Sequence, residues 1–256
     1  MASPVEHRSG VRALPPGPLD LRVRDLTVDH LGHRVLDRVE LDVAAGRITA
    51  LVGPTGSGKS TLMETIAGVL DASTGDVALG GVSLRDVAAD EWTAAVAIAF
   101  QESFLFTDSI EENVALGART PAEVATALAT ARADGFVADL DHGRDTVVGE
   151  RGTTLSGGQR QRVALARALA RAPRILLLDD ATSAVDPVVE AEILDSLRDT
   201  LDMTVLVVAH RISTILLADE VVFLDEGRVI ATGSHAELLE RDDYRALVTA
   251  YEQTSP

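Results

Sequence analysis

The chain has 256 residues, which suits one large domain or a core with a subdomain, and its 46% hydrophobic residues can fill a sizeable core. The formal net charge of −17 argues against a nucleic-acid partner, because duplex-binding proteins usually present a basic face. The absence of cysteine excludes disulfides and thiolate metal sites, and there is neither an apolar run of the ~20 residues of a membrane span nor a signal-peptide core. We therefore expect a soluble, intracellular protein that is still free to dock on a membrane protein.

The N-terminal segment is rich in proline, glycine and arginine, a composition typical of a linker. We therefore predict a linker over residues 1–19 and a single domain over residues 20–256.

The most specific motif is GPTGSGKS at residues 53–60 (the P-loop), which matches the phosphate-binding pattern GxxxxGK[ST] at every fixed position. It lies between a predicted strand at 47–53 and a predicted helix at 59–70, the context that this motif requires. Its glycines let the backbone wrap around phosphates, and the helix N-terminus adds a favourable dipole. Lys59, the only lysine among 23 basic residues, is expected to reach the β- and γ-phosphates, and Ser60 to ligate Mg²⁺. The agreement of strand, loop and helix disfavours an ordinary glycine-rich turn.

A second potential anion site lies at residues 153–171, where Ser156 precedes two glycines and an arginine- and alanine-rich helix. Serine is a favoured N-cap, and the free N–H groups at the start of a helix attract anions. Most capped helices bind nothing, so this signal becomes specific only in combination with the other motifs.

Two adjacent acids, Asp179 and Asp180, follow the aliphatic run at residues 175–178, which predicts a buried parallel strand. Open α/β sheets bind their ligands at the carboxyl ends of such strands. A P-loop NTPase needs an aspartate at this place to hold Mg²⁺. We therefore expect Asp179 to hold the metal and Asp180 to lie where a group can orient the attacking water.

The order of the motifs, from the P-loop through Gln101, LSGGQ, ILLLDD and Asp186 to His210, resembles that of the nucleotide-binding domains of ATP-binding-cassette (ABC) transporters over roughly residues 20–250. The resemblance implies an α/β fold, a P-loop NTPase with a RecA-like core, an antiparallel β-subdomain and an α-helical signature subdomain at about 103–171. It also implies that two such domains meet head to tail, so that each ATP lies between the P-loop of one chain and the LSGGQ segment of the other.

The same resemblance implies roles for single residues. The catalytic set would be Asp180, His210 at the γ-phosphate, and Gln101, and the Mg²⁺ ligands would be Ser60, Gln101 and Asp179. Without the resemblance, His210 is a core histidine after a predicted strand at 203–209, and Gln101 a polar residue at a strand end. The residues expected to bind ATP, in this chain or across the dimer interface, are His30, Gly53, Thr55, Gly56, Ser57, Gly58, Lys59, Ser60, Thr61, Ser156, Gly157, Gly158, Gln159 and Asp186.

The segment at residues 101–114 resembles the part of exporters that receives coupling helices from the membrane domain. Phe104 and Phe106 belong to a phenylalanine cluster there, which predicts a docking patch, with core packing as the alternative. The residues before LSGGQ also resemble exporters and put Glu150 and Arg151 near the transmembrane interface. We expect the chain to act at the cytoplasmic face of the cell membrane, either as an excised domain or as a subunit whose membrane part is a separate chain.

Two positions depart from the family's pattern. Asp180 stands where the family has Glu, and it is one methylene shorter. A water-polarising carboxylate contributes about 10²–10⁴-fold, and a misplacement of about 1 Å can cost about 10²-fold. Slow hydrolysis is therefore expected, as in the degenerate half of heterodimeric exporters whose partner carries Glu. His30 stands where the family stacks an aromatic residue, often tyrosine, on adenine, so weaker affinity for the base is expected.

Three functions remain open from the sequence. The leading one is the ATPase domain of a drug, lipid or peptide exporter, as one half of a heterodimer. The second is an ATP-dependent dimerisation clamp with little turnover, in which the partner chain hydrolyses ATP. The third, a soluble ABC protein acting on ribosomes or DNA, is disfavoured by the acidic charge, the single P-loop and the exporter-like segment. The transported substrate cannot be inferred, because specificity lies in transmembrane helices.

Overall fold

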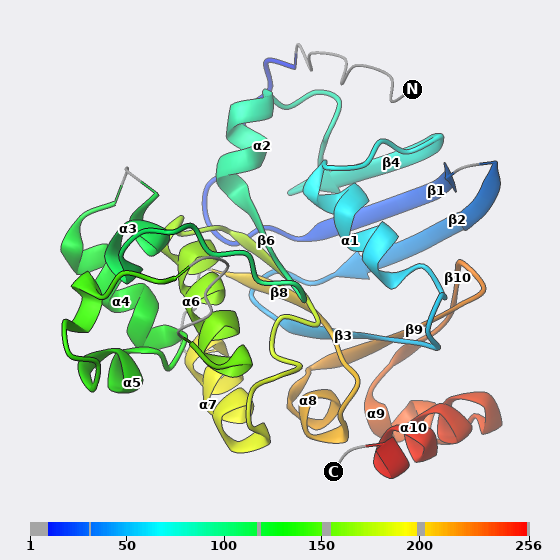
Figure 1. The fold of residues 1–256 in the computed structure, drawn as a ribbon. Coiled ribbons are helices and arrows are strands. Elements are labelled where there is room, and N and C mark those ends of the chain that lie inside the picture. The colour runs from blue at the N-terminus through cyan, green and yellow to red at the C-terminus, as the bar shows by residue number, and fades with distance from the viewer. Residues whose placement is uncertain (1–9, 31, 117–118, 150–154, 199–202, 255–256) are drawn as a thin grey trace.

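The computed structural model describes residues 10–30, 32–116, 119–149, 155–198 and 203–254. Figure 1 shows a body built on two sheets, with one group of helices to its left. In chain order the elements are β1 (Leu21–His30), β2 (His33–Val43), β3 (Ile48–Val52), α1 (Lys59–Ala67), β4 (Thr74–Leu79), β5 (Val82–Ser83), α2 (Ala89–Ala95), β6 (Val96–Phe100), α3 (Ile110–Ala115), α4 (Pro121–Thr130), α5 (Asp134–Ala138), a 3₁₀ turn (Gly143–Asp145), α6 (Gly157–Ala170), β7 (Ile175–Asp179), α7 (Pro187–Arg198), β8 (Thr204–Val208), α8 (Ile212–Leu217), β9 (Glu220–Asp225), β10 (Arg228–Gly233), α9 (His235–Leu238) and α10 (Asp242–Thr254).

The strands form an antiparallel sheet in the order β2-β1-β4-β5 and a second sheet in the order β10-β9-β3-β8-β7-β6. In the second sheet all neighbours are parallel except β10, which runs antiparallel to β9. Parallel strands end at the same edge of a sheet, so the loops after β3, β6, β7 and β8 all begin there. This edge is where the predicted site residues must meet.

Side chains of the parallel strands alternate between two hydrophobic cores. Leu176 and Leu178 of β7 pack in one cluster, whereas Ile175 and Leu177 pack in the other. Successive side chains of a strand point to opposite faces, so a strand covered on both faces is apolar at nearly every position. The predicted strand at 175–178 is therefore confirmed, and the strands predicted at 47–53 and 203–209 are β3 and β8.

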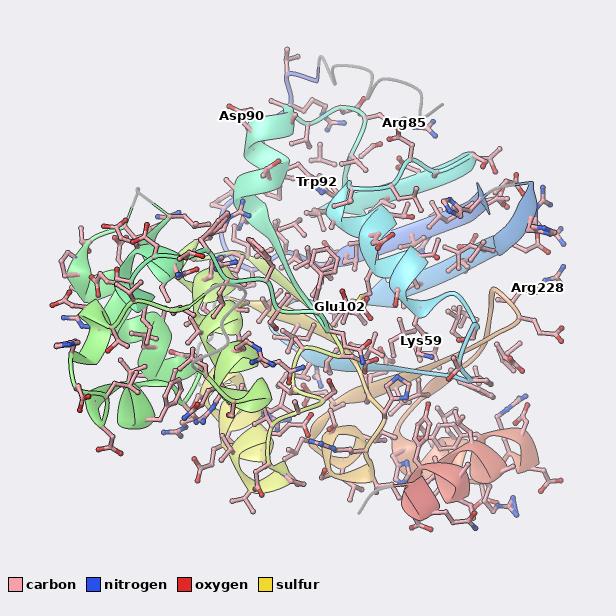
Figure 2. All side chains as sticks on the ribbon, in the orientation of Figure 1. Lys59, Arg85, Asp90, Trp92, Glu102 and Arg228 are labelled. Carbon is pink, nitrogen blue, oxygen red and sulfur yellow. The ribbon has the colours of Figure 1, made fainter. Side chains whose placement is uncertain are left out.

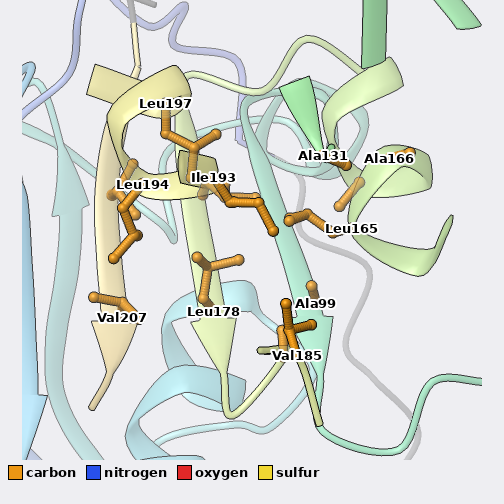
Figure 3. Packing of buried hydrophobic residues seen from close by; sticks show 14 of the residues in the cluster. Ala99, Ala131, Leu165, Ala166, Leu178, Val185, Ile193, Leu194, Leu197 and Val207 are labelled. Carbon is orange, nitrogen blue, oxygen red and sulfur yellow. The ribbon is translucent and has the colours of Figure 1, made fainter. Parts of the chain in front are cut away.

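Helix α7 covers one face of the parallel sheet. Its residues Ile193, Leu194 and Leu197 lie on one helical face and are buried against the cluster that contains Leu178 and Val207. Figure 3 shows these side chains over the strands, next to residues of α6. The same cluster extends into α4 and α6, so it joins the helical group to the sheet.

Helix α1 packs on the opposite face, between the parallel and antiparallel sheets, with Leu62, Met63 and Ile66 buried. It ends at Ala67, earlier than the predicted 59–70, because Gly68 adopts the left-handed conformation (φ 76°). The Gly68 N–H bonds back to carbonyls of the last turn, and this closes the helix. The glycine cap therefore ends α1 before the residue at which the spacing of apolar residues predicts its end.

Of the segment predicted to be a linker, residues 10–19 contact the domain. The Thr204 hydroxyl donates to the Leu19 carbonyl (2.7 Å), Arg174 Nε donates to the Gly17 carbonyl (2.8 Å), and the Leu14 N–H donates to Glu91 (2.7 Å). Residues 1–9 lie outside the described residues, so the linker stays a prediction for that part. Within the described ranges, none of the helices combines the length and apolar character that crossing a membrane requires.

We expect Ile193→Ala to lower the free energy of unfolding by about 2–5 kcal/mol, since Ile193 is fully buried and the cavity cannot close completely. Val188→Ala in the same helix is the control, because Val188 is 68% exposed and its truncation should change stability by less than about 0.5 kcal/mol. Urea unfolding followed by circular dichroism measures both. Equal losses in the two variants would contradict the packing of α7.

Candidate active site

The carboxyl ends of four neighbouring strands bring the predicted site residues together. The P-loop follows β3, Asp180 follows β7, His210 comes just after β8, and Gln101 follows β6. In the sheet register Phe100 pairs with Asp179, so Gln101 begins beside Asp180. Residues that are far apart in the sequence therefore line one edge of the sheet.

Two P-loop glycines stand where no side chain fits. A Cβ on Gly53 would lie 2.0 Å from the Leu224 carbonyl oxygen, and a Cβ on Gly58 would lie 2.7 Å from Leu36 Cδ2. Gly58 also has a positive φ of 102° and is the N-cap of α1. The loop can follow this path only with glycine at both positions, and it then points the start of α1 at the strand edge.

The other predicted P-loop residues differ in exposure. Thr55, Gly56 and Ser60 are exposed, Thr61 is half-buried and Ser57 is buried. Among the described residues, the Ser57 hydroxyl has no hydrogen-bond partner. The exposed residues face solvent at the N-terminus of α1, where a helix favours a bound anion.

Lys59 is buried, yet its ammonium is held by neutral groups. Its Nζ donates to the carbonyl oxygens of Gly53 (2.7 Å) and Pro54 (2.9 Å). Burial lowers the pKa of Lys59, and the nearby carboxylates of Asp180 and Asp179 offset part of this shift. Figure 2 shows Lys59 near the centre of the molecule. An ammonium whose partners among the described residues are both carbonyls keeps its charge available for an anion in the loop.

Asp179 and Ser60 form an oxygen pair that joins β7 to α1. The Ser60 hydroxyl donates to Asp179 Oδ1 over 3.1 Å. Burial raises the pKa of Asp179, while the Ser60 hydrogen bond and the Lys59 charge lower it in part. Hydroxyl and carboxylate oxygens are the ligands that Mg²⁺ prefers, and a divalent cation would compensate the buried carboxylate. The residues present therefore fit Mg²⁺.

Asp180 and His210 face each other across the ends of β7 and β8. His210 Nε2 lies 3.3 Å from Asp180 Oδ1, and both side chains are half-buried. Asp180 has a positive φ of 52°, a conformation that Asp tolerates better than most residues. The turn directs its carboxylate toward the histidine that follows β8.

Gln161 connects its own helix α6 to the loop after β6 and to the loop after β7. Its amide donates to the Gln101 carbonyl (3.3 Å) and to the Ser183 hydroxyl (3.0 Å), and its oxygen accepts the Ala184 N–H (2.8 Å). The side chain is only 5% exposed. Sequence reasoning missed Gln161, because its partners are distant in the chain and its only signal was its place just after LSGGQ.

Arg211, directly after His210, ties the loop that follows β7. It donates to the carbonyls of Ser183 and Val185 (2.8 Å each) and forms an ion pair with the buried Glu190 (2.7 Å). Sequence reasoning missed this pair as well, since nothing in either segment indicates the other. Arg211 thus holds the segment between Asp180 and α7 against the loop of His210.

The predicted N-cap at Ser156 is confirmed, and it forms a capping box with Gln159. A Cβ on Gly158 would lie 2.6 Å from the Ala184 carbonyl oxygen, so the signature segment packs against the residues just before Asp186. Ser156 and Asp186 are exposed, and Gly157 and Gln159 are half-buried. Within the described part of the chain, no hydrogen bond joins this segment to the P-loop. The two candidate anion sites are therefore separate in one chain.

His30 is not brought to the P-loop by any described contact. It is exposed at the tip of the β1–β2 hairpin, where it pairs with His33. Val35, which sequence reasoning missed, approaches the loop instead, with its carbonyl oxygen 3.1 Å from the Cβ position of Gly58. The adenine role of His30 stays a prediction.

The phenylalanines after β6 form an exposed pair. Phe104 and Phe106 are 57% and 49% exposed and meet edge to face with ring centroids 5.1 Å apart. The guanidinium of Arg167 lies 5.4 Å from the Phe106 centroid. This exposure argues against core packing for the two rings. Glu150 and Arg151, predicted to share their interface, lie outside the described residues.

Comparison with known proteins identifies the family. Residues 36–183, more than half of the chain, match the family described as "ABC transporter". The chain belongs to the ABC transporter family. The predicted fold class of an ABC ATPase domain is confirmed by a solved structure, a bacterial Atm1-family ABC exporter with ATP bound, with a TM-score of 0.89 and 37% identity over 98% of this chain and 45% of that one.

Curated relatives of this ABC domain are longer proteins. It is 42% identical over 236 residues to an ATP-dependent lipid A-core flippase of Hahella chejuensis, covering 90% of this chain and 40% of the relative. It is 41% identical over 240 residues to a multidrug efflux ATP-binding/permease protein of Mycobacterium tuberculosis, covering 92% of this chain and 20% of that protein. The chain thus spans less than half of the length of these relatives.

We expect Lys59→Ala to abolish measurable ATP binding, since no other lysine can reach the P-loop. The variant would lose two charge-assisted hydrogen bonds from the Lys59 ammonium to the β- and γ-phosphates. At about 1.5–3 kcal/mol each, their loss lowers the affinity for ATP more than about 100-fold. Titration calorimetry with MgATP measures the change. Arg85→Ala is the control, because it also removes a cation, but one that lies away from Lys59, at the top of Figure 2. This variant should bind MgATP as the wild type does. Unchanged affinity in the lysine variant would refute the P-loop assignment.

Proposed function

We propose that this ABC domain binds MgATP at the strand edge and hydrolyses it slowly, as the motor domain of an exporter. The observation that supports this most directly is the 3.1 Å hydrogen bond between Ser60 and Asp179, which joins the P-loop and the strand-end acid into one oxygen site beside Lys59. The names of its relatives, a flippase, an efflux protein and an ATP-bound exporter, favour the exporter class.

Each residue at the edge has a proposed role. Lys59 contacts the β- and γ-phosphates, His210 the γ-phosphate, and Asp180 the attacking water. Ser60 and Asp179, with Gln101, would hold Mg²⁺. The metal, when bound, neutralises phosphate charge as it develops during transfer. We assign the other residues that the sequence predicts to bind ATP to contacts with the nucleotide, either in this chain or across the dimer interface.

The exposed signature segment supports a head-to-tail dimer. Ser156 caps α6 at a solvent-facing helix start, away from the P-loop of its own chain. We assign this segment to the ATP of a partner domain that carries Glu after its strand-end Asp, and Asp186 to the interface. The domain would span residues 20–256, with its helical subdomain at about 103–171.

The exposed pair Phe104 and Phe106 is assigned to contact with a transmembrane domain. That contact would hold the chain at the cytoplasmic face of the cell membrane.

The second candidate function is an ATP-dependent clamp that dimerises with little turnover. It is favoured by the short side chain of Asp180, whose carboxylate lies 3.3 Å from His210. The Asp180 carboxylate would therefore lie one methylene further from the water that attacks the γ-phosphate than the carboxylate of a Glu at this position would. Steady-state hydrolysis with and without a Glu-bearing partner domain distinguishes the clamp from the motor.

We expect Ser156→Arg to leave ATP binding by the monomer intact and to block ATP-driven dimerisation. The bulky arginine side chain would occupy the place at the signature segment where the partner's ATP is proposed to bind. Ser234→Arg is a matched control, since Ser234 caps α9 with the same kind of capping box and loses a similar cap energy of about 1 kcal/mol. Light scattering with and without MgATP measures the dimer fraction. Loss of ATP binding in the monomeric Ser156 variant would show that the segment serves its own chain.

We expect Asp180→Glu to raise ATP hydrolysis by about 10²-fold, because the added methylene restores the reach of the carboxylate. The assay is steady-state phosphate release at a concentration where the domain dimerises through two intact signature segments. Asp180→Asn should lower the residual rate and leave MgATP affinity unchanged. If wild type already hydrolyses ATP as fast as the Glu variant, the degenerate-site proposal is wrong.

A further inference from the structure

The C-terminal helix α10 reaches the candidate site through one side chain. Tyr244, Val248 and Tyr251 follow each other at helical spacing, so they lie on one face of α10. Tyr244 and Val248 are buried, and the Tyr244 ring packs edge to face on Phe223 of β9 at 5.9 Å. This contact anchors the helix on the sheet and sets the place of Tyr251.

The Tyr251 hydroxyl binds the backbone at the start of the P-loop. It donates to the Gly53 carbonyl over 2.9 Å, and the Gly53 N–H points back to it over 3.4 Å. The Gly53 carbonyl also accepts from Lys59 Nζ at 2.7 Å. Tyrosine and lysine thus share one acceptor, and when the ammonium turns to a phosphate, Tyr251 remains to satisfy that carbonyl.

The Tyr251 ring contacts the histidine of the site. It packs against His210 with ring centroids 5.4 Å apart and planes at 67°. His210 Nε2 also lies 3.3 Å from Asp180 Oδ1. An imidazole in contact with both a ring and a carboxylate has few orientations available. Burial raises the pKa of Tyr251 to about 12, so its hydroxyl stays protonated and able to donate.

We propose that Tyr251 is a positioning residue that couples the C-terminal helix to the nucleotide site, its hydroxyl holding the P-loop at Gly53 and its ring orienting His210. The inference rests on the proposed function and adds a residue that none of the motifs contains. The two parts of the side chain act on different steps: the hydroxyl on nucleotide affinity, and the ring on turnover.

The test separates these two parts with two substitutions. Tyr251→Phe removes the hydroxyl and keeps the ring, so we expect affinity for MgATP to fall about 3–10-fold, the range for one hydrogen bond, with kcat nearly unchanged. Tyr251→Leu removes both, so kcat should fall as well. Titration calorimetry and steady-state phosphate release at saturating MgATP measure the two effects.

A spectroscopic readout distinguishes positioning from a general loss of stability. The His210 Cε1–H resonance, assigned with a His210→Asn variant, should move in Tyr251→Leu, because the ring current is lost, and stay in place in Tyr251→Phe. The control is Tyr244→Phe on the same helix, which loses a buried hydroxyl bonded to His235 at 2.8 Å, away from the P-loop. It should lower stability similarly and change neither ATP affinity nor the His210 resonance.

Each outcome decides the proposal. Wild-type MgATP affinity in Tyr251→Phe, or an unmoved His210 resonance in Tyr251→Leu, overturns the role of the tyrosine and leaves the proposed function standing. Loss of affinity in Tyr244→Phe equal to that in Tyr251→Phe also overturns it, since the effect would then belong to the stability of α10. Failure of the wild-type domain to bind MgATP overturns both the inference and the proposed function.

Discussion

The parallel pairing of β6, β7, β8 and β3 is the constraint on which the site depends. Burial on both faces favours apolar residues along these strands, so the charged and amide side chains of the site appear where the strands end. The pairing then aligns those ends, and the register of Phe100 with Asp179 is one result. A shift of one residue in β7 would exchange the two cores and move both acids away from the P-loop.

Lys59 and Asp179 are buried at this edge, and neither forms an ion pair with another residue that the structure describes. Lys59 is held by carbonyls and Asp179 by a hydroxyl, and burial shifts both pKa values toward the neutral form. A bound polyanion would favour the charged lysine, and a bound cation the charged carboxylate. The folded chain thus bears an electrostatic cost that MgATP, the proposed ligand, would relieve in both places at once.

Three side chains connect this edge to distant parts of the chain. Gln161 joins the helical group to the loops after β6 and β7, and Arg211 joins the loops after β7 and β8. Tyr251 joins the C-terminal helix to the P-loop. Each bonds mainly backbone groups, so displacement of one loop requires the others to adjust or to leave polar groups unpaired. Such a network gives a physical route by which a displacement of the helical group can reach the nucleotide site.

The sequence by itself determined the features that depend on near neighbours. Apolar runs identified the strands at 47–53, 175–178 and 203–209, GPTGSGKS identified the phosphate loop between strand and helix, and Ser156 was recognised as an N-cap, since these patterns need only a few adjacent residues. Only the tertiary structure decided that Gln161 reaches Gln101 and that Tyr251 reaches Gly53, 198 residues away. Such contacts depend on how α6 and α10 pack on the sheet. Packing of this kind arises from the summed burial of many side chains, which no local pattern records.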